Sequence, residues 1–279
     1  MSKAAKRERQ RLNREARREA ELAAARRRRR LKTARNVGLL LLPLVALFVF
    51  LQITRDDDEA AAITCDDVEA PAPKPVEPAA APATEIVPTT LYTAVLDTSC
   101  GRIEILLDTA QAPTVVNNFV VLARQGFYDD TSFHRAAENF VIQGGDPAGD
   151  GSGGAGYEIQ GEVPATGTGY TVGSVAMAKS GDAAPGTTGS QFFIITSQGQ
   201  GLQTLNTEPY QYAVLGQVSK GLKIAQKIES FAPAGAEGQP GDGPPTKVVL
   251  LKTVTIQETP TAPETTAPAT AAPETPPAS

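Results

Sequence analysis

The sequence predicts a mostly β domain, a closed antiparallel barrel with two helices, which follows a single membrane-spanning helix. Two observations support this fold class. One uninterrupted apolar run lies near the N-terminus, at residues 37–53, directly after a strongly basic segment. Between residues 91 and 257, short apolar runs alternate with Gly/Pro/Ser-rich loops, and two stretches far apart have helical periodicity. Many short strands with so few helices favour a closed antiparallel barrel over a sheet of βαβ units.

Residues 1–35 are expected to form a basic cytoplasmic arm. They contain 15 Lys/Arg and 4 Glu, a net charge of +11, so the net charge of −5 for all 279 residues leaves −16 on the remainder. Basic residues beside a membrane helix set its topology and attract anionic lipid, which makes membrane lipid the expected partner. Nucleic-acid binding by the arm is the alternative. The acidic remainder argues against nucleic acid as a partner of the main domain, because phosphate contacts need Lys and Arg.

Residues 36–54 are expected to form the transmembrane helix. The run Val37–Ile53 has no charged residue, and as a helix it would be about 26 Å long, the short end of a membrane span. A buried core helix and a cleaved signal peptide are the alternatives, and Ala60-Ala61-Ala62 is similar to a cleavage site. The basic arm is longer than that of a signal peptide, so we prefer an uncleaved anchor. The positive-inside rule then places the chain after Arg55 outside the cytoplasm.

Two further segments have a composition that disfavours a packed core. Residues 55–90 are acidic and then Pro/Ala-rich, and we expect an extended spacer there. Residues 258–279 form a Pro/Thr/Ala tail that we expect to be disordered. Cys65 and Cys100 both follow the membrane run, where oxidation is permitted, so we expect a disulfide between the spacer and the first hairpin turn. Two unpaired thiols and intermolecular pairing are the alternatives.

The pattern of residues 91–257 predicts the elements of one domain. Two alternating runs flank the turn Ser99–Gly101 and predict a hairpin. Pro113 opens a helical stretch with apolar residues on one face, which ends at Gly126. A second helix is predicted over residues 222–230. Further strands are predicted at residues 140–143, 175–178, 192–196, 212–218 and 247–256.

Several cofactor classes are disfavoured. The chain has one histidine and two cysteines, too few for a structural zinc site, so no metal is expected. Gly149-x-Gly151-x-x-Gly154 matches the dinucleotide fingerprint, but the residues that follow form no apolar helix that could point at a pyrophosphate. A glycine-rich loop without a cofactor is the better interpretation. Ser190 does not lie in a nucleophile elbow.

Two segments carry the functional signal. Residues 132–147 read SFHRAAENFVIQGGDP, and residues 189–196 read GSQFFIIT. In order and spacing these phrases resemble the cyclophilin family of peptidyl-prolyl cis/trans isomerases, as do residues 126–129 and 173–178. The resemblance covers about residues 91–257 and implies an eight-stranded antiparallel barrel capped by two helices. With the predicted anchor, the chain resembles a membrane-anchored bacterial member that acts on proline-containing exported or envelope polypeptides and needs no cofactor.

The resemblance also implies a site. Arg135 matches the catalytic arginine of the family, and Gln143 matches a glutamine that contacts the substrate backbone. The implied substrate-binding residues are Phe140, Val141, Gln191, Phe193, Leu205 and Tyr212. Phe140 and Phe193 match the walls of the proline pocket.

The chain departs from the family pattern at several positions. It contains no tryptophan, and Leu202 or Leu205 lies nearest to the position that holds one in cyclosporin-sensitive members. Tyr212 stands where many members have histidine, and Lys179-Ser180 where an Asn-Ala pair is common. These departures keep a second function open, a non-catalytic Pro-peptide-binding module or holdase chaperone. A third possibility is an envelope structural protein.

Overall fold

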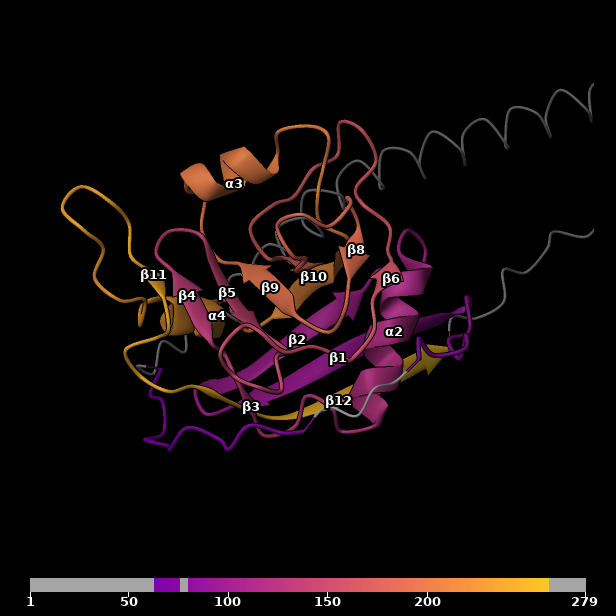
Figure 1. Cartoon of the computed structure of the whole chain (residues 1–279). Helices are drawn as coiled ribbons and strands as arrows, with labels where there is room; N and C mark the ends of the chain where they lie inside the picture. Colours follow the sequence, from indigo (N-terminus) through magenta and orange to yellow (C-terminus); the bar gives the residue numbers. More distant parts are fainter. Residues whose placement is uncertain (1–62, 76–79, 261–279) are drawn as a thin grey trace, which may run out of the picture. The chain divides into compact units, whose positions relative to one another are not determined.

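A strongly curled antiparallel sheet dominates the domain, with helices packed against it (Figure 1). The computed structural model describes residues 63–75 and 80–260. The predicted basic arm, the predicted transmembrane helix and residues 261–279 of the predicted tail lie outside the described residues. Within the described ranges, no helix combines the length and the apolar character that crossing a membrane requires.

The main sheet has ten strands in the order β11-β4-β5-β9-β7-β10-β2-β1-β12-β3. Their bounds are β1 Thr90–Thr98, β2 Gly101–Leu107, β3 Thr131–Ser132, β4 Arg135–Ala137, β5 Val141–Gly144, β7 Ser174–Met177, β9 Phe192–Ile195, β10 Val214–Lys220, β11 Asp242–Gly243 and β12 Leu250–Pro260. A small second sheet pairs β6 (Ile159–Gln160) with β8 (Thr187–Thr188). The helices are α2 (Pro113–Arg124), α3 (Gln200–Leu205) and α4 (Leu222–Glu229).

The two ends of the sheet curl towards each other. β3 lies at one end and β4 is next to the other end, yet Phe133 and His134 alone separate them in the chain. A single bridge between Ser132 and Asp146 joins β3 to the segment that follows β5. The mostly β antiparallel prediction is therefore confirmed, but the predicted eight-stranded closed barrel is a curled ten-stranded sheet. The extra strands arise from two-residue pairings such as β3 and β11, which are too short to leave a sequence pattern.

The main core lies between the sheet and the helices α2 and α4. The predicted apolar face of α2 is buried, and its Phe119 stacks on Tyr128 with ring centroids 4.8 Å apart. Phe192 meets Phe119 edge-on at 5.8 Å. The N-terminus of α2 is capped from a distant loop, because the Glu162 carboxylate accepts the backbone N–H groups of Thr114 and Val115 at 3.0 and 3.3 Å. Such a carboxylate satisfies donors that a helix start leaves unpaired.

Both predicted helices are confirmed by α2 and α4. The predicted hairpin is confirmed by β1 and β2, whose ladder runs from Thr93↔Leu106 to Thr98↔Gly101. The helix α3 was not predicted, because six residues are too few to show a periodic apolar face.

The described part of the predicted spacer packs against the domain, which differs from the expectation of a free segment. Cys65 and Cys100 form a disulfide with an S–S distance of 2.05 Å. The backbone N–H of Asp66 donates to Ser99 at 2.8 Å, and that of Lys74 donates to Pro147 at 2.9 Å. This segment therefore lies along the hairpin end of the sheet, held by one covalent bond and several hydrogen bonds.

Residues 80–89 are attached to helix α2 in a similar way. The side chain of Asn117 accepts the N–H of Glu85 at 2.7 Å and donates to the carbonyl of Ala83 at 3.0 Å. Ile86 is buried in the main core. Proline and alanine supply little apolar area for a core of their own, but their backbone groups can still bind a surface that is already formed. The folded unit therefore begins before residue 90.

Replacing both Cys65 and Cys100 with serine is expected to lower stability without abolishing activity. The bond closes a loop of 35 residues, for which chain-entropy arguments give roughly 2–4 kcal/mol. For a domain of this size that corresponds to a drop in Tm of about 5–15 °C. Thermal melting checks this, with wild type reduced by dithiothreitol as the control. A double variant that melts with oxidised wild type would contradict a stabilising role.

Candidate active site

Three of the predicted site residues fall into register on three adjacent strands. Arg135 on β4 lies opposite Gln143 on β5, and Gln143 lies opposite Phe193 on β9. Side chains on a strand alternate between its two faces. Arg135, Gln143 and Phe193 therefore point to the same face of the sheet, away from the main core.

The opposite face of the same three strands builds the main core. It carries Ala136, Ile142, Phe192 and Ile194, all of which are buried there. Phe192 belongs to this core, whereas Phe193, the predicted pocket wall, belongs to a second apolar cluster on the site face.

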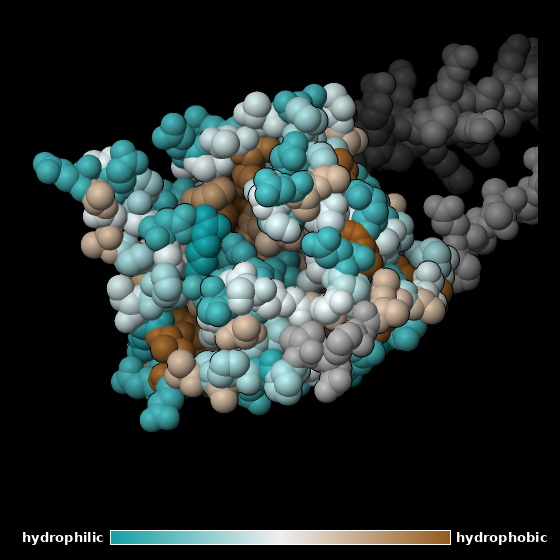
Figure 2. Space-filling model, in the orientation of Figure 1, coloured by the Kyte–Doolittle hydropathy of each residue, from teal (hydrophilic) through white to brown (hydrophobic). Residues whose placement is uncertain are grey.

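That second cluster forms an apolar hollow. Its members among the predicted substrate-binding residues are Phe140, Val141, Phe193, Leu205 and Tyr212. The ring of Tyr212 stands perpendicular to that of Phe193, with centroids 5.3 Å apart. Figure 2 shows apolar side chains recessed in this face below α3, with polar side chains around them. Leu202 and Leu205 both join the cluster from α3, so this helix supplies the wall where the sequence offered either leucine.

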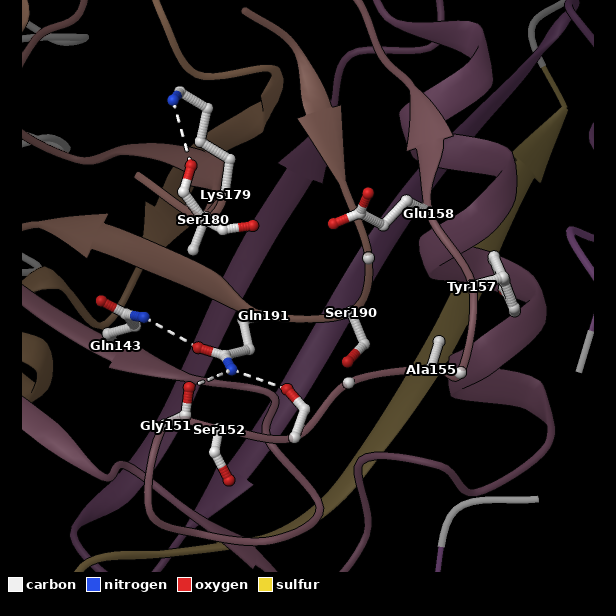
Figure 3. Close-up of a pocket in the computed structure, with 15 residues that line it drawn as sticks. Gln143, Gly151, Ser152, Ala155, Tyr157, Glu158, Lys179, Ser180, Ser190 and Gln191 are labelled. Carbon is white, nitrogen blue, oxygen red and sulfur yellow. Dashed lines mark hydrogen bonds between the residues drawn. The ribbon is translucent and has the colours of Figure 1, made fainter. Parts of the chain in front are cut away.

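A row of polar side chains borders the hollow. Nη1 of Arg135 donates to Oε1 of Gln143 at 3.0 Å, and Nε2 of Gln143 donates to Oε1 of Gln191 at 2.9 Å. Gln191 in turn donates to the carbonyls of Gly151 and Gly153 at 3.0 and 2.7 Å (Figure 3). The structure thus brings the predicted Arg135, Gln143 and Gln191 together in one hydrogen-bonded chain.

The glycine-rich segment after residue 148 forms a loop, and its carbonyls accept the last hydrogen bonds in this row of side chains. Gly149 and Gly151 have φ angles of 76° and 88°, which L side chains rarely adopt. The carbonyls of Gly151 and Gly153 accept hydrogen bonds from the side chain of Gln191. In the described structure no helix follows directly after this loop, unlike in a dinucleotide-binding motif. The interpretation of this run as a loop is confirmed.

Asp242 is a site residue that the sequence did not indicate. Its carboxylate accepts hydrogen bonds from Nε and Nη2 of Arg135, both at 2.7 Å. The hydrogen bonds that Arg135 donates to Asp242 raise the pKa of Arg135 above its ordinary value, although burial acts in the opposite direction. Asp242 lies 107 residues from Arg135 in a Gly/Pro-rich loop, and it reaches the site because β11 pairs with β4.

Two cavities adjoin residues of the polar row or their partners. One, of about 350 Å³, is lined by Gln143, Gln191, the loop of residues 151–158 and the unusual Lys179 and Ser180 (Figure 3). The ammonium group of Lys179 bends back onto the backbone carbonyls of Ser180, Gly181 and Ala183 at 2.9–3.2 Å. The other cavity, of about 590 Å³, lies between Phe140, Gly201 and Asp242. The first cavity therefore adjoins Gln143 and Gln191, and the second adjoins Asp242, the partner of Arg135.

His134 is packed beside the row and has a structural environment. Burial lowers the pKa of His134, and the positive charge of Arg135 adds to this effect, against the influence of Asp146 and Asp150. Neither ring nitrogen makes a hydrogen bond to another described residue. This environment favours the neutral imidazole, which fits a structural role for His134.

Comparison with known proteins decides the family. Residues 93–256, more than half of the chain, match the model of the cyclophilin-type peptidyl-prolyl cis-trans isomerase family. This chain belongs to that family. Membership confirms the family resemblance and the predicted enzyme class, a peptidyl-prolyl cis-trans isomerase.

The relatives of this cyclophilin are spread widely. It is 34% identical over 171 residues to peptidyl-prolyl cis-trans isomerase-like 1 of Gibberella zeae, a match that covers 59% of this chain and 94% of the relative. It is 34% identical over 200 residues to probable peptidyl-prolyl cis-trans isomerase B of Mycobacterium leprae, which covers 66% of this chain and 63% of the relative. A solved cyclophilin-type isomerase of Cryptosporidium parvum aligns with a TM-score of 0.51 at 28% identity, over 61% of this chain and 99% of that one.

Proposed function

We propose that this cyclophilin accelerates rotation about X-Pro bonds in exported or envelope polypeptides, and that an N-terminal helix anchors it in a membrane. The observation that carries the catalytic part is the position of Arg135. Its guanidinium stands at the edge of an apolar hollow and is already oriented by hydrogen bonds to Gln143 and Asp242.

The reaction needs no nucleophile, because no covalent bond breaks. The barrier of about 18–20 kcal/mol arises from the resonance that is lost as the C–N bond twists. A site accelerates this rotation when it binds the twisted amide more tightly than the planar one. In the twisted amide the prolyl nitrogen gains a lone pair that can accept a hydrogen bond.

Arg135 is suited to donate that hydrogen bond. A guanidinium has five N–H groups in a rigid fork and stays protonated. Hydrogen bonds to Asp242 and Gln143 use three of them, so two remain available within the described part of the chain. The ring of the proline would sit among Phe140, Val141 and Phe193, while the amide of Gln143 holds a backbone group of the peptide.

A non-catalytic Pro-peptide-binding module is the second candidate. Lys179 and Ser180 support it, because they line the cavity beside Gln143 where the family commonly has an Asn-Ala pair. Binding of Pro-peptides without turnover would establish this function.

Three observations support the proposed location. The basic arm precedes an uncharged run of 17 residues, Val37–Ile53, and the positive-inside rule orients such a helix with the arm in the cytoplasm. The chain after this run contains the disulfide between Cys65 and Cys100. Disulfides persist in oxidising compartments outside the cytoplasm. A membrane-anchored bacterial enzyme is the proposal that fits these observations together.

Arg135→Ala is expected to lower kcat/KM by about 10²–10³-fold, the scale for losing one preorganised donor to a developing charge. Arg135→Lys should also lose most activity, since an ammonium group cannot reproduce the fork. The measurement is Pro-peptide isomerisation alongside thermal melting. Arg102→Ala is the matched control, because Arg102 also pairs with an aspartate, Asp97, but on the exposed edge of the hairpin. An Arg135→Ala variant with near-wild-type turnover would refute the mechanism.

Protease added to intact cells or spheroplasts is expected to digest or release the catalytic domain, because the proposed topology places it outside. A tag on residues 1–35 should stay protected until the membrane is opened. Protection of residues 91–257 while the membrane is intact would overturn the proposed location.

A further inference from the structure

We propose that Asp242 is a positioning residue of the isomerase site, whose carboxylate fixes the plane of the Arg135 guanidinium for donation to the prolyl nitrogen. This inference rests on the proposed function. It assigns a catalytic contribution to the loop of residues 231–246, which lies more than 90 residues from the catalytic arginine in sequence.

The geometry of the pair supports orientation. Nε and Nη2 of Arg135 each donate to a different oxygen of Asp242 at 2.7 Å, a two-point contact that fixes the guanidinium plane. The opposite edge, Nη1, donates to Gln143 at 3.0 Å. Without Asp242, one hydrogen bond to a neutral amide would hold the end of a long side chain with several rotatable bonds. Arg135 would then lose entropy each time it met the substrate in the productive orientation.

Asp242 is itself held by the backbone around it. It pairs with Ala137 in the ladder between β11 and β4. Next to it, the carbonyl of Gly241 accepts the N–H of Glu138 at 2.8 Å, and the N–H of Gly241 donates to the Glu138 carboxylate at 3.1 Å. The base of the loop is closed by a hydrogen bond from the N–H of Thr246 to the carbonyl of Phe231 at 2.7 Å. These hydrogen bonds fix the backbone of Asp242 relative to β4, and so fix the position from which its carboxylate reaches Arg135.

Charge supports the same role. A substrate that covers the hollow removes water from Arg135, and an unpaired buried charge is costly. Asp242 keeps the guanidinium paired while its remaining N–H groups stay available. Both side chains of the pair are partly exposed: 34% of the Arg135 side chain and 48% of the Asp242 side chain are accessible to solvent.

The test compares Asp242→Asn and Asp242→Glu with wild type in the full chain. We expect Asp242→Asn to lower kcat by about 10-fold, the scale of one lost charge-assisted hydrogen bond, while KM changes by less than about 2-fold and the melt stays near wild type. Asp242→Glu should recover part of kcat, because it restores a carboxylate. In an Arg135→Ala background, Asp242→Asn should cause no further loss. Asp97→Asn is the matched control, since it removes the same kind of Arg–Asp contact away from the site.

Side-chain NMR of Arg135 separates this inference from the proposed function. The Nε–H proton should exchange slowly with water in wild type and rapidly in Asp242→Asn, whether or not turnover is measured. Unchanged exchange, or an Asp242→Asn variant whose kcat equals or exceeds that of wild type, would overturn the positioning role. A fall in activity that follows a lower melting temperature, without recovery in Asp242→Glu, would also overturn it. A wild type without turnover but with protected Nε–H would instead refute the proposed function.

Discussion

Side-chain alternation on the strands β4, β5 and β9 places the core and the site on opposite faces of the sheet. One face of these strands carries Ile142, Phe192 and Ile194 into the main core, and the other face carries Arg135, Gln143 and Phe193 to the site. A shift of the register by one residue would exchange the two faces. The core therefore fixes the site, because burying one set of side chains forces the other set outwards.

Other parts of the chain complete this arrangement from a distance. The glycine-rich loop supplies the carbonyls that orient Gln191, and α3 supplies an apolar wall. The loop that carries Asp242 adds β11 to the edge of β4 and brings a carboxylate to Arg135. Loops thus add Asp242 and the glycine carbonyls to the polar groups of Arg135 and Gln143, which the strands carry. The division suits a reaction that depends on holding one donor in place more than on acid–base chemistry.

The sequence predicted mainly those elements and site residues whose pattern lies within a short stretch of the chain. The hairpin of β1 and β2 and the helix α2 follow from periodicity, a turn and an initial proline, all within short windows. Arg135 and Gln143 were found because they lie eight residues apart in one continuous motif. Asp242 was not found, because its contact depends on a two-residue strand pairing across 107 residues. The attachment of residues 63–75 was underestimated for a similar reason, since composition does not report backbone hydrogen bonds to a distant surface.

Methyl NMR of the full chain during titration with a proline-containing peptide tests whether the outer face of these three strands is the isomerase site. Two pairs of neighbours report on the two faces: Val141 and Ile195 lie in the site cluster, whereas Ile142 and Ile194 lie in the main core. A site on this face predicts shifts at Val141 and Ile195, little change at Ile142 and Ile194, and enzyme-dependent exchange between cis and trans peptide signals. Larger shifts at the core pair, or binding at the outer face without any exchange, would contradict it.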